Sequence, residues 1–305
     1  GRRKKEMALR SLDNALPKSP ERCKKPSKFG ASIQKQSDPA VNDENKATFP
    51  QDATIDYIFS ENLEPISDPE TWILSLPEGL ESNDWVRVCE ALNSVRRFAL
   101  YQSTLLLPLL EKVISVVVKS MKSPRSALCK TSIMASSDLF TAYRDGLLES
   151  SMSGAFDQLV LQLLLKACQD KRFVCDEAEK ALKTMVGSMT PLSLLCRLRT
   201  FVSHSNPRVR AKAAVSMSQC VSKMGWEGMK EHGVPALLQI AAELLSDRLP
   251  EARDAGRSIV VSVCGGFAGN GEHNEDSWQD FCHCNLPPVH AQPIVKMTAS
   301  HCSGD

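Results

Sequence analysis

Apolar side chains recur at helical spacing through almost the whole of residues 53–268. One stripe runs through Val86, Cys89, Leu92 and Val95, and similar stripes follow further along the chain. No two alternating apolar runs flank an Asn-Gly or Asp-Gly turn, so the usual signal of a β-hairpin is missing. The pattern therefore predicts an all-α fold.

Breaks in the pattern divide it into ten expected helices. Their ranges are 70–79, 85–99, 104–121, 124–144, 155–168, 172–187, 191–203, 207–224, 229–246 and 250–266. The valine-rich segments 113–118 and 259–263 are the places where a strand could replace a helix.

The ten helices pair into five hairpins. The second helices begin near Asp84, Pro124, Lys171, Pro207 and Pro250, so successive repeats are 36 to 47 residues apart. Two-helix HEAT or armadillo repeats have a period of roughly 40–47 residues. A single hairpin leaves one apolar face uncovered, whereas stacked hairpins bury that face in a continuous core. We therefore expect an α-solenoid of about five HEAT-type hairpins.

Several helix starts carry capping signals. Ser123 and Asn206 are good N-cap residues, and each is followed by a proline. Proline suits the first helical position because the N–H that it lacks would have no partner there. Pro191 and Pro250 fit the same position, so four helices are expected to begin at prolines.

The segment before the repeats, residues 1–52, is polar and basic, and its composition predicts a disordered tail. Two readings of its clusters Arg2–Lys5 and Arg22–Lys28 are open. They are either a solvated tail, or a contact for an acidic polymer or a nuclear-import signal.

The helical period is lost again over residues 269–305, which we expect to form a second disordered tail, acidic and then rich in Cys and His. Cys282, Cys284 and His290 suggest zinc, but their spacing does not match a zinc-finger pattern. His301 and Cys302 do not complete one. We therefore expect no metal here.

Composition narrows the function further. The net charge is +1, which argues against the broad basic field of a nucleic-acid-binding protein. No apolar run approaches the ~20 residues of a membrane span, and no secretory signal is visible. Seven single cysteines within helical patterns read as buried thiols in a reducing compartment, so the cytoplasm is the expected location. They are Cys89, Cys129, Cys168, Cys175, Cys196, Cys220 and Cys264.

Motifs for catalysis are missing from the sequence. It has no Walker loop, no G-x-G-x-x-G, no H-E-x-x-H and no G-x-S-x-G. The glycine cluster Gly265–Gly269 follows a helix and reads as its C-cap and hinge. His204 has no neighbour that would make it a base, and the carboxylates of Asp176 and Glu177 fit an exposed first helical turn. We expect no enzyme and no cofactor.

The starts of the second helices carry the candidate binding residues. Equivalent loops of a solenoid line up along one edge, and each basic side chain would lie beside a positively polarised helix N-terminus. Such an edge would suit an acidic protein partner. Taken singly, these residues read as ordinary surface cations and a core tryptophan, but their recurrence in successive loops favours the edge. The residues are Trp85, Arg125, Lys171, Arg172, Arg208, Arg210, Arg248 and Arg253.

At these loops the sequence resembles the TOG domains of the CLASP and crescerin type. The resemblance rests on Glu81–Leu92, with its Asp-Trp opening, on Ser205–Arg210, on Pro250–Arg253, and on Arg257 one turn later. It covers residues 72–267. TOG domains have six repeats where we can place five, so a missing sixth would leave the fifth uncapped.

The resemblance implies a non-enzymatic microtubule-associated protein that binds αβ-tubulin through the loops within its repeats. Trp85 would pack on β-tubulin, and the basic residues of the later loops would reach toward α-tubulin. The expected partners are αβ-tubulin or microtubules, without membrane or nucleic acid, for a chain that is monomeric unless its tails mediate assembly. The alternative is a generic HEAT scaffold that holds a peptide or helix of a protein complex.

Overall fold

The computed structural model describes residues 57–269 and 275–302. The chain divides into two units, residues 1–51 and 52–305, and every described residue belongs to the second. The expectations for residues 1–52 therefore lie outside the described residues.

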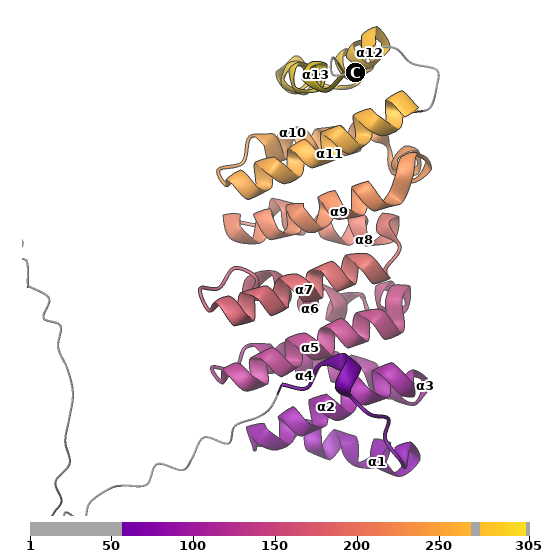
Figure 1. Ribbon diagram of the computed structural model, residues 1–305, viewed down its shortest axis with the longest axis vertical. Helices are drawn as coiled ribbons and strands as arrows, with labels where there is room; N and C mark the ends of the chain where they lie inside the picture. Colours follow the sequence, from indigo (N-terminus) through magenta and orange to yellow (C-terminus); the bar gives the residue numbers. More distant parts are fainter. Residues whose placement is uncertain (1–56, 270–274, 303–305) are drawn as a thin grey trace, which may run out of the picture. The chain divides into compact units, whose positions relative to one another are not determined.

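The described helices form six hairpins that stack in chain order (Figure 1). These are α1 (Pro69–Leu80) with α2 (Trp85–Tyr101), α4 (Leu110–Met121) with α5 (Ser126–Tyr143), α6 (Ser153–Lys166) with α7 (Arg172–Ser188), α8 (Pro191–Leu198) with α9 (Pro207–His232), α10 (Val234–Leu245) with α11 (Pro250–Gly269), and α12 (Glu275–Asn285) with α13 (Pro288–Cys302). Shorter pieces are η1 (Ser60–Asn62), α3 (Ser103–Leu106), η2 (Leu107–Leu109), η3 (Arg144–Leu148) and η4 (Phe201–Ser203). Nine of the ten predicted helices are confirmed with shifted ends, whereas the predicted helix 104–121 is divided into α3, η2 and α4. The described part of the chain contains no strand.

The second helices pack against one another as a layer in the order α2, α5, α7, α9 and α11. The first helices lie beside them as a second layer. One continuous apolar cluster runs from Leu76 in α1 to Ile294 in α13, and the expected stripe through Cys89, Leu92 and Val95 lies within it. Full burial of such a side chain contributes about 1.5–3 kcal/mol, so the stacking of neighbouring hairpins stabilises each of them.

The prediction of a disordered segment after residue 268 is wrong for residues 275–302, which form α12 and α13. Trp278 is buried, its ring lies 5.2 Å from that of Phe267, and its indole N–H donates to Thr298 Oγ1 at 2.9 Å. The apolar periodicity of these two helices, with Pro293 inside α13, is too weak to read from the sequence. They supply the sixth hairpin and cover the fifth.

The glycine cluster at the end of α11 was also misread. Gly265 and Gly266 lie inside α11, which continues to Gly269. A Cβ on Gly266 would lie 2.8 Å from the Trp226 ring, so only glycine allows this close approach. Trp226 follows Gly225, whose φ of 69° and ψ of 176° are not helical. Two helices therefore meet at a kink within α9, and the predicted end of a helix at residue 224 is confirmed.

Three of the four proline predictions are confirmed, because α8, α9 and α11 begin at Pro191, Pro207 and Pro250. The fourth is wrong: α5 begins at Ser126, and Ser123 Oγ instead accepts a hydrogen bond from the Arg125 N–H at 3.2 Å. A polar turn therefore precedes this helix where the sequence suggested its first residues.

Residues 57–63, which precede the first hairpin, cross the second-helix layer. The Arg96 guanidinium in α2 donates to Asp138 of α5 at 2.6 Å and to the Ile58 carbonyl at 2.7 Å. Ser60 Oγ also donates to Asp138, at 2.7 Å, and Leu63 is buried. The segment is thus fastened across two hairpins by a buried ion pair.

Candidate binding edge

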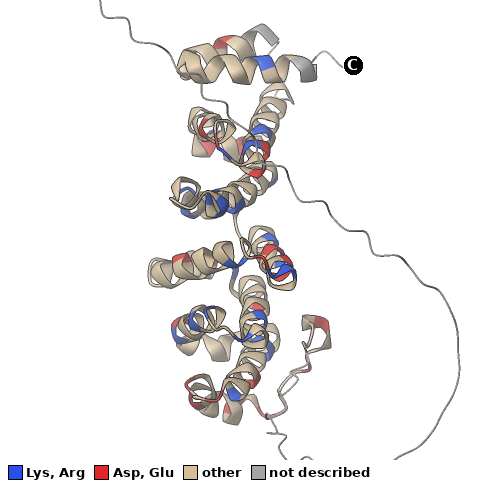
Figure 2. Ribbon diagram, turned by 90° about the vertical axis from the view of Figure 1, so that its left-hand side faces the viewer, with Lys and Arg blue, Asp and Glu red and all other residues tan. Residues whose placement is uncertain are grey.

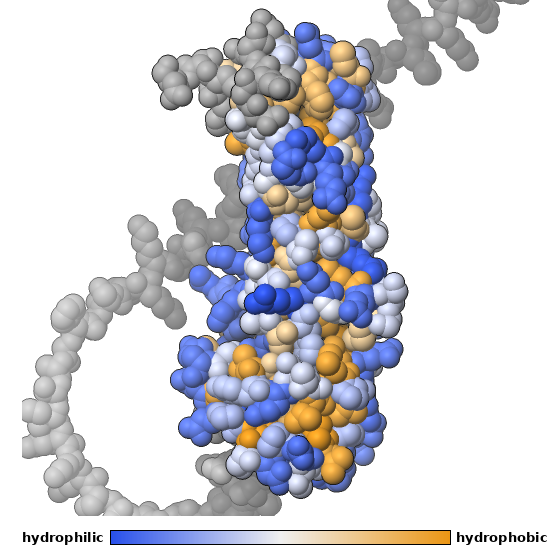
Figure 3. Space-filling model, turned by 90° about the vertical axis from the view of Figure 1, so that its right-hand side faces the viewer, coloured by the Kyte–Doolittle hydropathy of each residue, from blue (hydrophilic) through white to orange (hydrophobic). Residues whose placement is uncertain are grey.

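The five loops that join α1 to α2, α4 to α5, α6 to α7, α8 to α9 and α10 to α11 lie on one side of the stack, the left in Figure 1. We call this side the loop edge. Seen from it, Lys and Arg recur along the stack with Asp and Glu among them (Figure 2). Hydrophobic residues gather in patches along the opposite side (Figure 3). The expected alignment of the loops is therefore present, with mixed charge.

Trp85 lies in the first turn of α2, which begins as predicted after Asp84. The Asp84 carboxylate accepts a hydrogen bond from the Val86 N–H at 3.0 Å, as an N-cap does. The indole is partly buried against the apolar core, and the Arg125 guanidinium carbon lies 4.8 Å from its ring centre. This is a cation–π contact. Trp85 is therefore neither fully buried in the core nor fully exposed for a partner.

Side chains of the loop edge bridge successive loops. Lys171 Nζ donates to Ser126 Oγ at 3.3 Å, one repeat earlier. Arg208 Nη1 donates to the Cys168 carbonyl at 3.3 Å and lies 3.8 Å from a carboxylate oxygen of Asp170. With the contact between Arg125 and Trp85, these bridges connect the first four loops.

Arg210 and Arg253 have a different role, because both hold the backbone of the loops. Arg210 donates to Asp247 Oδ2 and to the His204 carbonyl, both at 2.9 Å. Arg253 donates to the carbonyls of Asp247 and Arg248 at 2.8 and 2.9 Å. Their donors are engaged inside the domain, so they shape the edge more than they offer it to a partner.

The remaining basic residues are exposed. Arg172 is 93% exposed and lies 3.7 Å from Asp176, one turn later on α7. Arg248 also projects from its loop. Five of the predicted basic residues are therefore exposed along the edge: Arg125, Lys171, Arg172, Arg208 and Arg248.

A hollow between the second and third loops was not anticipated from the sequence. Lys166, at the end of α6, lines it with Lys171 and is almost fully buried. Its only sequence signal is a single cation within the apolar pattern of that helix. This hollow adds Lys166 to the basic residues near the loop edge.

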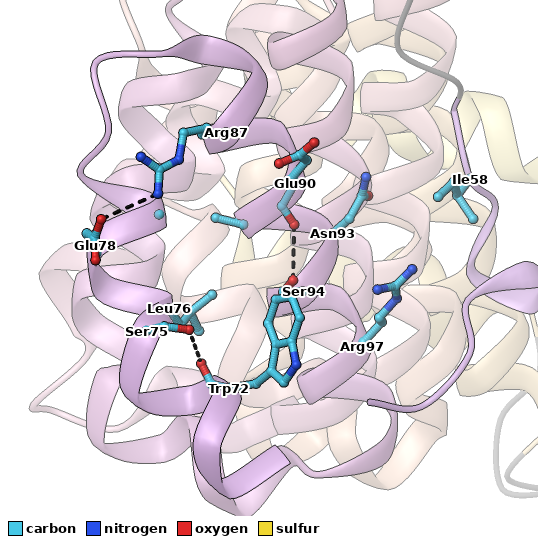
Figure 4. Close-up of a pocket in the computed structure, with 12 residues that line it drawn as sticks. Ile58, Trp72, Ser75, Leu76, Glu78, Arg87, Glu90, Asn93, Ser94 and Arg97 are labelled. Atoms are coloured by element: carbon cyan, nitrogen blue, oxygen red, sulfur yellow. Dashed lines mark hydrogen bonds and ion pairs between the residues drawn. The ribbon is translucent and has the colours of Figure 1, made fainter. Parts of the chain in front are cut away.

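A second hollow, of about 410 Å³, lies between α1 and α2 (Figure 4). Trp72, which is 50% exposed, and Arg97 face it from opposite helices. Arg87 pairs with Glu78 at 3.4 Å on its rim. This hollow is lined by an aromatic ring and a guanidinium group. None of the candidate binding residues of the loop edge lines it.

Cysteine and histidine side chains give no metal centre in the described ranges, where no group of three or more His, Cys, Asp or Glu residues could hold an ion. Cys282 is buried and Cys284 is exposed, while the side chains of His301 and Cys302 lie outside the description. Cys196 is exposed on α8, which corrects its expected burial, and Cys168 and Cys175 are half-buried. Burial raises the pKa of the Cys89 thiol to about 11. No described helix is long and apolar enough to cross a membrane.

No family model matches the chain. Two curated relatives, from mouse and human, are both called TOG array regulator of axonemal microtubules protein 1. The mouse protein is 31% identical over 208 residues, which are 67% of this chain and 11% of that protein. The human protein is 33% identical over 197 residues, which are 65% of this chain and 10% of that protein. The chain spans about a tenth of the length of these relatives.

Solved structures share the fold at low identity. A TOG domain of Zyg9 from C. elegans has a TM-score of 0.57 and 16% identity, covering 75% of this chain and 82% of that one. Crescerin, which uses a TOG domain array to regulate microtubules in the primary cilium, gives 0.54 and 13%, covering 73% and 87%. The N-terminal domain of MAST/Orbit gives 0.52 and 12%, covering 75% and 96%. The stacked hairpins therefore have the architecture of these domains.

Proposed function

We propose that this chain, whose stacked hairpins form a TOG domain, binds αβ-tubulin along its loop edge and thereby influences microtubule dynamics or organisation. The observation that carries the proposal is the arrangement of the edge. Trp85 lies at the start of α2, directly after the first loop, with the Arg125 guanidinium over its ring, and exposed cations recur in or beside the loops that follow. The names of the mouse and human relatives support the same partner.

Two kinds of residue on the edge would contribute to binding, an aromatic side chain and exposed cations. Large aromatics at the centre of interfaces are frequent hot spots, and Trp85 has enough exposed surface to contact a partner. Exposed cations steer an acidic partner toward the edge and set the register of binding. The role is binding rather than catalysis, and it places the protein on microtubules in the cytoplasm.

Charge reversal on the edge tests the proposal. Microtubule co-sedimentation and gel filtration with free tubulin are measured for the parent and for Arg208→Glu/Arg248→Glu. Both arginines are exposed, so the variant should keep its melting temperature and lose binding. The difference should shrink as salt rises, because exposed charges are screened beyond about 8 Å at physiological ionic strength.

The matched control is Lys183→Glu/Lys230→Glu, which makes the same change of net charge at exposed positions in the middle of α7 and at the far end of α9, away from the loops. Equal binding by the two double variants at low salt would show that overall charge, not the loop edge, determines association. A parent that binds neither tubulin nor microtubules would reject the proposal and favour the alternative of a scaffold for another protein complex.

A further inference from the structure

The hollow between α1 and α2 lies in the first hairpin and contains none of the candidate residues of the loop edge (Figure 4). We call it the Trp72 hollow. Its α2 wall runs from Arg87 to Arg97, which is about 15 Å at the helical rise of 1.5 Å per residue. An extended peptide of about four or five residues spans the same length. At Gly79, which also lines it, the two helices pack closely, because a Cβ there would lie 3.1 Å from that of Ala91.

The α1 wall of the hollow presents an aromatic surface. Trp72 is 50% exposed. The hydroxyl groups near it are already bonded within their own helices, because Ser75 Oγ donates to the Trp72 carbonyl at 3.0 Å and Ser94 Oγ donates to the Glu90 carbonyl at 3.1 Å. An exposed indole ring among satisfied polar groups favours contact with an aromatic or large apolar side chain.

Arg97 supplies the second binding element, from α2. Its Nε atom is buried, and across residues 57–269 and 275–302 no hydrogen bond or ion pair engages its side chain. Arg96, one residue earlier, instead donates to Asp138 at 2.6 Å and to the Ile58 carbonyl at 2.7 Å. A guanidinium N–H that is shielded from water without an acceptor costs free energy, so an acceptor delivered by a ligand would be bound favourably.

The other charges of the lining indicate where this acceptor would lie. Arg87 is already paired with Glu78 at 3.4 Å. Glu90 lies about two turns, or roughly 10 Å, before Arg97 on α2, and its carboxylate would repel a second one placed beside it. A carboxylate ligand is therefore favoured at the Arg97 end of the hollow, where a guanidinium can donate two parallel hydrogen bonds to it.

We propose that the Trp72 hollow binds an extended segment of a partner protein, in which Asp or Glu lies close to an aromatic or large apolar side chain. The apolar side chain packs on Trp72, and the carboxylate pairs with Arg97. This face of α2 already holds one non-helical segment, residues 57–59, through the bond from Arg96 to the Ile58 carbonyl, and Ile58 lines the hollow. The site is separate from the loop edge, so its test does not depend on tubulin.

Peptide selection tests the inference. A random heptapeptide library displayed on phage is selected on the full chain, and peptides that also bind Arg97→Gln are removed. The surviving peptides should carry Asp or Glu within about three residues of an aromatic or large apolar side chain, because both must fit one hollow. The strongest peptide is then made with its carboxylate changed to an amide. This change should lower its affinity by about tenfold or more, because Arg97 would again lack a charged acceptor.

Trp72→Ala is the second variant, and it should lower the affinity for the selected peptide by about tenfold or more, as loss of an aromatic anchor does. Trp72 is half-exposed, so the fold should survive the change. The matched control Arg199→Gln removes a guanidinium after α8, where the side chain is 40% exposed, and should leave the affinity unchanged.

Melting followed by circular dichroism checks that each variant is folded. Arg97→Gln should melt close to the parent temperature, because its Nε has no hydrogen bond to lose. If it melts early, Trp72→Ala replaces it in the selection. The inference is overturned if the enriched peptides lack an acidic residue, if no peptide distinguishes the parent from the variant, or if Trp72→Ala binds the selected peptide as well as the parent does.

Discussion

Arg210 Nε donates to Asp247 Oδ2 at 2.9 Å and joins the fourth loop to the fifth. The side chain of Asp247 is 8% exposed and that of Arg210 is 21% exposed. Arg208, two residues earlier, is exposed and reaches a different loop. Arg208 and Arg210 therefore have different roles. The sequence alone does not distinguish them, because both lie in the motif Ser205–Arg210.

Replacing each arginine by methionine should separate these tasks. Arg210→Met should lower the free energy of unfolding by about 1–3 kcal/mol, because it removes charge-assisted hydrogen bonds in a partly buried site. Arg208→Met should leave stability within about 0.5 kcal/mol of the parent, as usual for a surface position, and weaken tubulin binding. Urea denaturation and tubulin gel filtration measure the two effects. Equal losses of stability would show that the two side chains are not distinguished in this way.

The Asp247 pair should also appear in the pH dependence of stability. Burial alone would raise the pKa of Asp247, but hydrogen bonds from the Leu249 N–H and Arg210 outweigh it and hold the pKa below its usual value of 3.8. Because the pKa of this carboxyl is lower in the folded than in the unfolded protein, its ionised form stabilises the fold at pH values above the unfolded pKa. This stabilisation is lost as the pH falls through the folded pKa. The difference in the free energy of unfolding between the parent and Asp247→Asn should therefore become smaller below about pH 3.8. A constant gap down to pH 2 would contradict the linkage.

Trp85 should contribute to both folding and binding. Since it is half-buried, Trp85→Ala should destabilise the domain by less than the ~3–5 kcal/mol typical of a buried aromatic. It should also weaken tubulin binding by about 2 kcal/mol or more, as a hot spot does. Trp72→Ala, away from the loop edge, is the control and should leave binding unchanged. A Trp72 variant that loses binding as strongly would move the interface to the hollow between α1 and α2.

The sixth hairpin should be required for the stability of the fifth. Trp278 is 4% exposed and packs against Phe267, so Trp278→Ala should cost about 3–5 kcal/mol. Removing residues from 270 onward should lower the melting temperature further, because the end of α11 would be uncovered. Thermal unfolding followed by circular dichroism checks both changes. Parent-like melting of the shortened chain would mean that α12 and α13 add nothing to the stack.

Thiol labelling should map burial around the C-terminal hairpin. Burial raises the pKa of Cys282 to about 12, so the native protein should not alkylate there at pH 8, whereas Cys196 and Cys284 are exposed and should react. Mass spectrometry of peptides from briefly treated protein reads the pattern. A chelator should leave both the pattern and the melting temperature unchanged. Rapid labelling of Cys282 after chelation would indicate a metal-held segment.

How much of the fold the sequence predicts depends on how regular the apolar period of each element is. Long amphipathic helices such as α2 and α7 declare themselves through apolar periodicity, and Asp84 marks a helix start within one residue. The same pattern does not predict α12 and α13, because their apolar periodicity is weak and Pro293 lies inside α13. The set of loop residues was readable from repeat spacing. Which of them hold backbone carbonyls, as Arg210 and Arg253 do, depends on contacts between repeats that no local pattern carries.

Residues 57–63, which cross the second-helix layer, suggest an order in which parts of the domain fold. Most contacts in a solenoid join neighbours, so such folds nucleate locally and propagate. The bond from Ser60 to Asp138 spans 78 residues, and loop closure of that length must wait until α2 and α5 have met. We therefore expect residues 57–63 to dock late in folding, when they supply Arg96 with two further hydrogen-bond partners, the Ile58 carbonyl and Ser60 Oγ.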